Sequence, residues 1–132
     1  SGLKAELGRI AEDSQPVSVR LERSCYIVVD TMYGKKDFFT AIYEFVFAMV
    51  RSGHDMARRI EEFTGGFKVA LDRLVREGIA SGELRGNVDP EAATETLYAL
   101  MESVALRVML GVEKDSTRAK HRFSAVVAGL VA

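Results

Sequence analysis

The sequence predicts an all-α fold, a bundle of about six helices. Apolar residues recur three and four positions apart along nearly the whole chain, the spacing of one helix face. Glycine, proline and capping residues separate these stretches. The run Tyr26-Ile27-Val28-Val29 has strand-like composition, but helical spacing continues through it and no partner strand is evident. With 48% apolar residues in 132, the chain can bury a core, and we expect one domain over residues 1–132.

The first three helices follow from local signals. Leu3, Leu7 and Ile10 mark a short helix that ends near residues 13–14. Pro16 opens a second helix, and Gly34 ends it. Asp37 is then expected to cap a third helix over residues 38–51. This third helix is apolar on nearly every side, so it should be buried or should line a cavity.

The last three helices have clearer ends. A long helix is predicted over residues 55–81, where Gly65-Gly66 should bend it or let another helix approach. Gly82 and Gly111 suit left-handed helix ends, and between them Asp89 and Pro90 should start a helix over residues 89–110. Asp115 or Ser116 should cap the last helix, over residues 115–132.

The helix over residues 89–110 predicts self-association. Only a narrow strip with Glu91, Glu95 and Glu102 is clearly polar, so its apolar surface needs covering on two sides. The final helix adds a strip of small residues that lets two backbones come close. We expect these two helices to pair with their symmetry mates in a homodimer. The expected interface residues are Leu100, Ser103, Val104, Arg107, Val108, Phe123, Ala125, Val126, Ala128 and Gly129.

The stretch over residues 78–111 also resembles a known family. It reads GIASGEL, then a polar turn with Asp-Pro-Glu, then AATETLYALMESVALR. This pattern is similar to the C-terminal half of TetR-family transcriptional regulators. The resemblance implies a dimerising domain that binds a small-molecule effector. It also implies a helix-turn-helix domain upstream of this chain, through which alone DNA would be bound, and a regulator expected to act as a repressor.

The remaining motifs exclude most other functions. No Walker loop, dinucleotide fingerprint or nucleophile elbow occurs, so we expect no enzyme and no cofactor. His54 and His121 lie outside any Glu-x-x-His pair, and no metal site is predicted. Cys25 reads as a buried, inert thiol. The net charge of −1 is unlike that of a nucleic-acid-binding domain, and no membrane span or signal peptide is evident, so a cytoplasmic location is expected.

Aromatic and methionine residues gather in the second to fourth helices. A packed core would explain any single one, but packing so many large rings without a void is demanding. Together with the resemblance, this predicts a pocket for a hydrophobic or amphipathic molecule. The expected lining residues are Tyr26, Val29, Met32, Phe39, Ile42, Tyr43, Val46, Phe63, Phe67, Tyr98 and Met101. Two alternatives stay open: a helical dimerisation module without a ligand cavity, and, more weakly, a helical-bundle enzyme.

Overall fold

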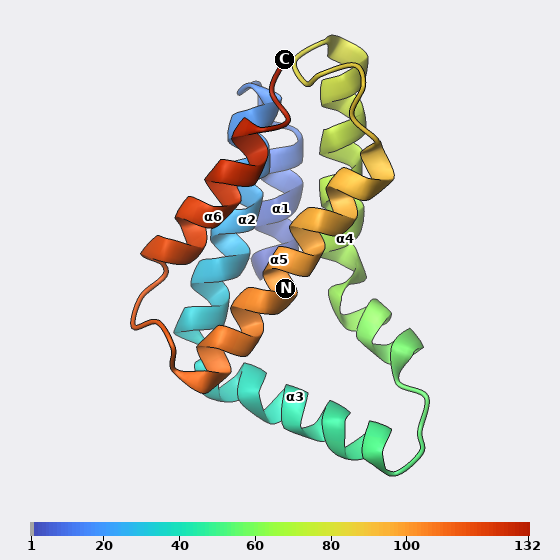
Figure 1. Ribbon diagram of the computed structural model, residues 1–132, viewed down its shortest axis with the longest axis vertical. Helices are drawn as coiled ribbons and strands as arrows, with labels where there is room; N and C mark the ends of the chain where they lie inside the picture. The colour runs from blue at the N-terminus through green and yellow to red at the C-terminus, as the bar shows by residue number, and fades with distance from the viewer. Residues whose placement is uncertain (1) are drawn as a thin grey trace.

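The computed structural model describes residues 2–132 and contains six α-helices (Figure 1). This confirms the predicted all-α class and the number of helices. In chain order the helices are α1 (Gly2–Ala11), α2 (Val17–Gly34), α3 (Lys36–Arg51), α4 (Ala57–Ser81), α5 (Pro90–Leu110) and α6 (Thr117–Ala128).

Helix α2 is the centre of the bundle, because it packs against every other helix. Helices α1, α4, α5 and α6 surround it, and α3 runs crosswise at one end (Figure 1). The core between them is almost entirely aliphatic, with one aromatic ring, Phe123, fully buried. The other fully buried large side chains among the described residues are Val17, Leu21, Cys25, Val29, Leu71, Leu74, Val75, Leu84, Leu97, Val104 and Val127.

The predicted C-terminal ends of α4 and α5 and the predicted N-terminal cap of α5 are confirmed. Gly82 and Gly111 follow the two helices with φ of 82° and 66°, a conformation in which a Cβ would clash. Asp89 caps α5, and its Oδ1 accepts hydrogen bonds from the Glu91 and Ala92 amides at 3.0 and 3.1 Å. These features are local, which is why the sequence shows them.

Three predicted helix boundaries need correction. Helix α3 starts at Lys36, so Lys35 alone separates it from α2, and Asp37 lies within its first turn. There its negative charge interacts favourably with the positive end of the helix dipole. Helix α4 starts at Ala57, whose amide donates to Asp55 outside the helix.

The third corrected boundary is the end of α6, which stops at Ala128 and not at the last residue. The chain beyond it runs antiparallel to the start of the α4–α5 connection, where Val131 pairs with Leu84. Two backbone bonds hold this pairing: Arg85 N to Leu130 O at 2.9 Å and Ala132 N to Glu83 O at 3.1 Å. The sequence offered no sign of it, because the two partners are far apart along the chain.

Helix α3 is not buried, contrary to one of the two expectations for it. None of its side chains reaches full burial, and Phe38, Phe45 and Phe47 are more than half exposed. The reason is its position: α3 crosses the end of the bundle and packs mainly against α5 and the adjoining part of α2, with an aromatic contact to α4. The other expectation, that α3 lines a cavity, bears on the site described below.

Of the two effects predicted for Gly65-Gly66 in α4, a bend or the close approach of another helix, the close approach does not occur. A Cβ added at Gly66 would meet nothing within 4 Å, so no helix approaches closely there. The helix is unbroken, although its N-terminal part leans away from the rest (Figure 1). The close approach is at Gly78, where an added Cβ would lie 2.6 Å from Leu84 and 2.8 Å from Val17.

A buried arginine joins three helices, and sequence analysis did not identify it. The Arg20 side chain is only 6% exposed and binds both carboxylate oxygens of Glu77, at 2.7 and 3.1 Å. It also donates to the backbone carbonyls of Ala11 and Gln15. The end of α1 is thereby attached to α2 and α4, and the guanidinium is fully compensated for its burial.

Candidate functional site

Aromatic side chains meet where α3, the first turns of α4 and the middle of α5 come together. The rings of Phe39 on α3 and Phe63 on α4 lie edge to face, with centroids 6.3 Å apart. Phe38 lies edge to face on its neighbour Phe39 at 5.7 Å, and farther along α3 the tilted rings of Tyr43 and Phe47 lie 6.2 Å apart. The structure thus brings aromatic side chains of two consecutive helices, α3 and α4, together on one surface.

Polar groups lie at the edge of this surface. The Tyr98 hydroxyl on α5 is hydrogen-bonded to the Thr64 hydroxyl on α4, and the Lys68 ammonium lies 5.6 Å from the centroid of the Tyr98 ring. Burial, followed by the nearby Tyr98 and Glu102, raises the pKa of Tyr43, so its phenol is a protonated donor at neutral pH. Hydroxyls beside apolar rings suit a ligand with a large apolar part and a small polar one.

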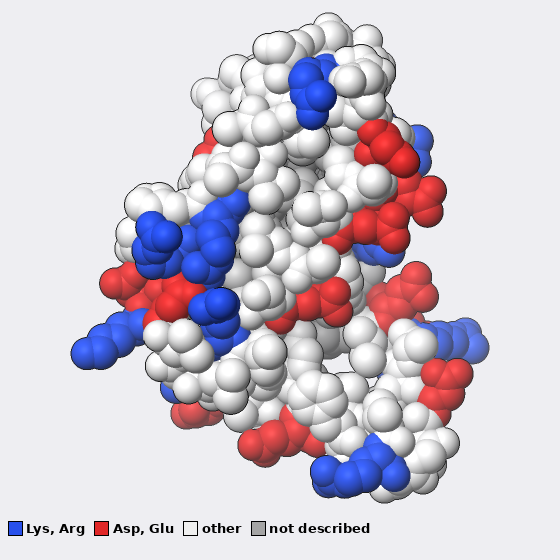
Figure 2. All heavy atoms as spheres, viewed as in Figure 1, with Lys and Arg blue, Asp and Glu red and all other residues white. Residues whose placement is uncertain are grey.

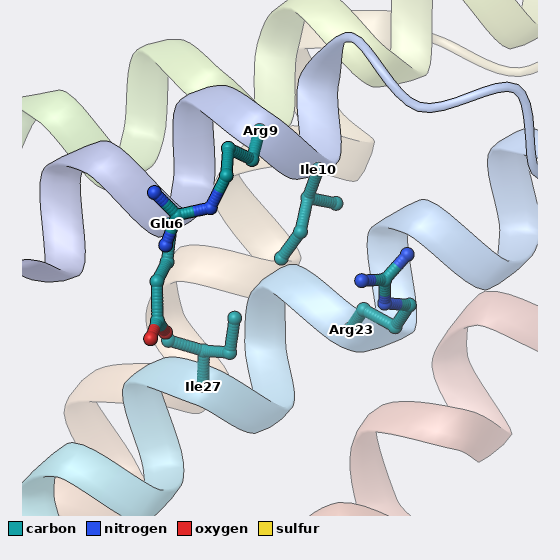
Figure 3. A pocket seen from close by; sticks show the side chains of 5 residues that line it. All are labelled: Glu6, Arg9, Ile10, Arg23 and Ile27. Carbon is teal, nitrogen blue, oxygen red and sulfur yellow. The ribbon is translucent and has the colours of Figure 1, made fainter.

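The region is open rather than enclosed. Figure 2 shows the surface hollowed between α3, the N-terminal part of α4 and α5. Two other hollows lie elsewhere on the part of the chain that is described. One, of about 310 Å³, lies between α1 and α2, with Arg9 and Arg23 beside Ile10 and Ile27 (Figure 3). The other, of about 270 Å³, lies beside the α2–α3 junction.

The predicted ligand residues fall into three groups. Phe39, Ile42, Tyr43, Val46 and Tyr98 are half-buried, on the helices that meet at the hollow, and Phe63 is about half exposed there. A second group is packed in the core, with at most 7% of each residue exposed. These residues lie behind the side chains that would touch a ligand. The group comprises Val29, Met32, Phe67 and Met101.

Tyr26 forms the third group, because it takes part in a different contact. Its hydroxyl is bonded to Glu22 of the same helix and to Ser124 of α6, and Lys120 lies over its ring at 5.6 Å. Ser124 also donates to Glu22 at 2.8 Å. These bonds hold the Tyr26 phenol between α2 and α6. Tyr26 therefore does not lie with Tyr43 and Tyr98, the other tyrosines predicted to line the pocket.

The predicted interface residues also divide by burial. Val104, Val108 and Phe123 belong to the protomer's own core, so they have no surface to offer a second chain. Leu100 and Val126 are half-buried against the core. Exposed are Ser103, Arg107, Ala125, Ala128 and Gly129.

Two exposed leucines on α5 were missed. Leu106 is 50% exposed and Leu110 is 67% exposed. They follow Ser103 at helical spacing, so they share its face. The sequence did carry this signal, but α5 is apolar over so much of its circumference that periodicity alone did not tell the core side from the outer side.

Several other properties of the described chain bear on function. Cys25 is fully buried, and burial raises the pKa of its thiol well above the usual range, which agrees with an inert thiol. Within residues 2–132, no three His, Cys, Asp or Glu side chains are grouped so that they could hold a metal ion. None of the helices over the same residues has the length and hydropathy needed to cross a bilayer.

Comparison with known proteins identifies the class. A family model matches this all-helical domain. Residues 27–132 match the C-terminal domain of BetI-type transcriptional repressors. The match spans most of the chain, so the chain belongs to this family of TetR C-terminal domains. No curated protein and no solved structure matches the chain.

Membership of this family sets the broad role. TetR-family C-terminal domains are regulatory and non-enzymatic, and they typically dimerise and bind ligands in proteins that also bind DNA. The role of the chain therefore lies in transcription regulation.

Proposed function

We propose that this chain is the effector-binding and dimerisation domain of a TetR-like repressor that senses a small hydrophobic or amphipathic molecule. The observation that carries the proposal is α3, a helix with a wide apolar surface that the rest of the protomer covers only in part. Its half-buried side holds Phe39 and Tyr43 toward α4 and α5, with the Thr64 and Tyr98 hydroxyls close by. A ligand with an apolar body would cover this surface and gain the free energy of its burial.

The arrangement supports a mechanism for the response. A ligand between α3, α4 and α5 favours one position of α3, because α3 is attached to the core along one side only. Movement there reaches α1 through α2, since Arg20 attaches α1 to α2 and α4. In a full-length protein, α1 would pass this change to an upstream DNA-binding unit. The ligand shifts the equilibrium only by its difference in affinity for the two states, typically about 1–3 kcal/mol.

Binding of an apolar fluorescent probe tests the site. N-Phenyl-1-naphthylamine should bind the purified chain with saturable enhancement of its emission. Phe39→Ser should weaken this binding by about tenfold, since an aromatic contact and its buried area are lost. Phe45→Ser is the matched control, because Phe45 lies on the same helix but is 57% exposed on its outer side. Circular dichroism checks that both variants remain helical.

A plain helical dimerisation module is the second candidate. It is favoured because the aromatic region is open and because the two hollows of about 310 and 270 Å³ lie elsewhere. In that case the probe would not saturate, or the Phe39 and Phe45 variants would lose affinity equally. Either result would remove the effector-binding half of the proposal.

A further inference from the structure

The hydroxyls at the edge of the aromatic hollow form a chain of hydrogen bonds with a defined direction. The Thr64 hydroxyl on α4 donates to the Ile60 carbonyl at 2.8 Å, which uses its only hydrogen. In its bond with the Tyr98 hydroxyl on α5, Thr64 is therefore the acceptor and Tyr98 the donor. Both hydroxyl hydrogens are engaged within the protein, so a ligand in the hollow must find its donors elsewhere.

Two other donors lie beside this pair. Lys68 follows Thr64 by one turn of α4, and no carboxylate within residues 2–132 forms an ion pair with it. The Tyr43 hydroxyl on α3 has no hydrogen-bond partner over the same residues. Both side chains are half-buried, but neither polar atom is among the enclosed ones that lack a partner, so a ligand can reach both. The hollow thus offers an ammonium and a phenol as free donors.

A comparison with Lys120 shows which contact Lys68 lacks. Lys120 Nζ lies 5.6 Å from the centroid of the Tyr26 ring, and it also pairs with the Asp30 carboxylate at 2.9 Å. Lys68 Nζ lies at the same distance from the centroid of the Tyr98 ring but has no such carboxylate. Because hydrogen bonds between two charged groups are the strong ones, the place that Asp30 takes beside Lys120 is open, beside Lys68, to the carboxylate of a ligand.

The charge of Glu102 acts in the opposite direction but is better screened. Burial, and then the nearby Tyr98 and Glu102, raise the pKa of Tyr43, so Glu102 lies close to the same hollow. Glu102 is exposed, however, whereas Lys68 is half-buried beside the Tyr98 ring. Water and dissolved ions screen an exposed charge more than a partly buried one. The charges at the hollow therefore favour an anionic head group over a cationic one.

We propose that the effector is an amphipathic carboxylate. Its acid group pairs with the Lys68 ammonium and accepts a hydrogen bond from the Tyr43 hydroxyl, and its apolar part covers the rings of Phe39 and Phe63. This inference rests on the proposed effector site and names the chemical class of the molecule that binds there. A carboxylic acid with a pKa of about 4–5 is ionised at neutral pH, so the ion pair forms under ordinary conditions.

Displacement of N-phenyl-1-naphthylamine from the purified chain tests the head group. Decanoate, decanol and decyltrimethylammonium carry the same alkyl chain and differ in charge, and each is titrated at about pH 7 below the concentration at which it forms micelles. Decanoate should bind at least tenfold more tightly than decyltrimethylammonium. Lys68→Met should weaken decanoate binding by about tenfold or more and leave decanol binding unchanged, because only the ion pair is lost. Tyr43→Phe should weaken decanoate binding by about fivefold.

Two further variants serve as controls. Lys120→Met removes a lysine with the same ring contact on α6, away from the hollow, so it should leave the three affinities unchanged. Lys68→Arg keeps the positive charge and should keep the preference for decanoate. Circular dichroism checks that all variants remain helical.

The outcomes separate this inference from the effector proposal. Equal weakening of decanoate and decanol by Lys68→Met would overturn the inference, as would tighter binding of decyltrimethylammonium than of decanoate, or a bound probe that decanoate does not displace. In each of these cases the probe still binds, so the effector site itself stands. A probe that does not bind saturably would remove the effector site and the carboxylate inference together.

Discussion

The absence of a Cβ atom at Gly78 allows α2 and α4 to pack closely. Gly78 lies on α4 where Val17 and Leu84 leave no room for a Cβ. Its missing side chain is therefore a packing requirement, whereas Gly66 on the same helix faces open space. Alanine substitutions at these two glycines therefore separate the effect of a packing clash from the effect of reduced backbone flexibility.

Gly78→Ala should lower the free energy of unfolding by about 1–3 kcal/mol, because Leu84 and Val17 must move to admit the methyl group. Gly66→Ala should leave it unchanged or raise it by about 0.5–1 kcal/mol, since alanine is the better helix former. Urea denaturation followed by circular dichroism measures both. Equal effects of the two substitutions would show that Gly78 is not a packing position.

Glu83 makes stability depend on pH. Its carboxylate accepts hydrogen bonds from the Val17 amide at 3.0 Å and the Ser81 hydroxyl at 2.9 Å, and these bonds lower its pKa from 4.5. A carboxyl whose pKa is lower in the folded state stabilises the fold above its unfolded pKa. This contribution is lost as the pH falls through the folded pKa.

Glu83→Gln should therefore cost stability at neutral pH, and the difference from the parent chain should shrink as the pH drops below about 4. Urea denaturation of both chains at about pH 7, 5 and 3 provides the measurement. Asp13 and Asp115, whose pKa values are also lowered by hydrogen bonds, are present in both chains and cancel in the comparison. A difference that stayed constant across this range would contradict the assignment.

At the scale of elements, α3 differs from the other five helices. It has no buried residue, whereas α2 has eight and α5 has seven. Local opening costs least where few apolar side chains are buried. The α3 helix is therefore the element most easily moved by a ligand.

Amide hydrogen exchange measures this difference. The amides of α3 should exchange faster than those in the middle of α2 and α5, and an apolar ligand at the aromatic hollow should slow them. Protection of α3 equal to that of α2 in the free chain would mean that the helix is a fixed part of the core, and the proposed response would lose its moving element.

The elements also show what the sequence can predict. Helix ends set by one or two neighbouring residues, such as Asp89, Gly82 and Gly111, were predicted correctly. The Arg20 network and the pairing of Val131 with Leu84 were missed, because each joins residues that are distant along the chain. In the site, periodicity found the aromatic residues of α3 and α4, but it could not show that Tyr26 faces α6.

At the scale of the whole molecule, both α5 and α6 carry exposed apolar residues. Leu106 and Leu110 project from α5, and Ala125, Ala128 and Gly129 are exposed on or beside α6. Exposed apolar residues on these two helices suit packing against a second chain. The proposed dimer thus uses the two helices that sequence analysis indicated, through a partly different set of residues.

Sedimentation equilibrium of the purified chain tests this claim most directly. The chain has a mass of 14.6 kDa, and we expect a species of twice that mass at micromolar concentration. Leu106→Glu should convert it to the single-chain mass, because it buries an unpaired charge in the interface. Val69→Glu, at an even more exposed apolar position on α4, should leave the doubled mass unchanged. A parent chain that kept the single-chain mass at about 100 µM would contradict the dimer, and with it the proposed regulatory role.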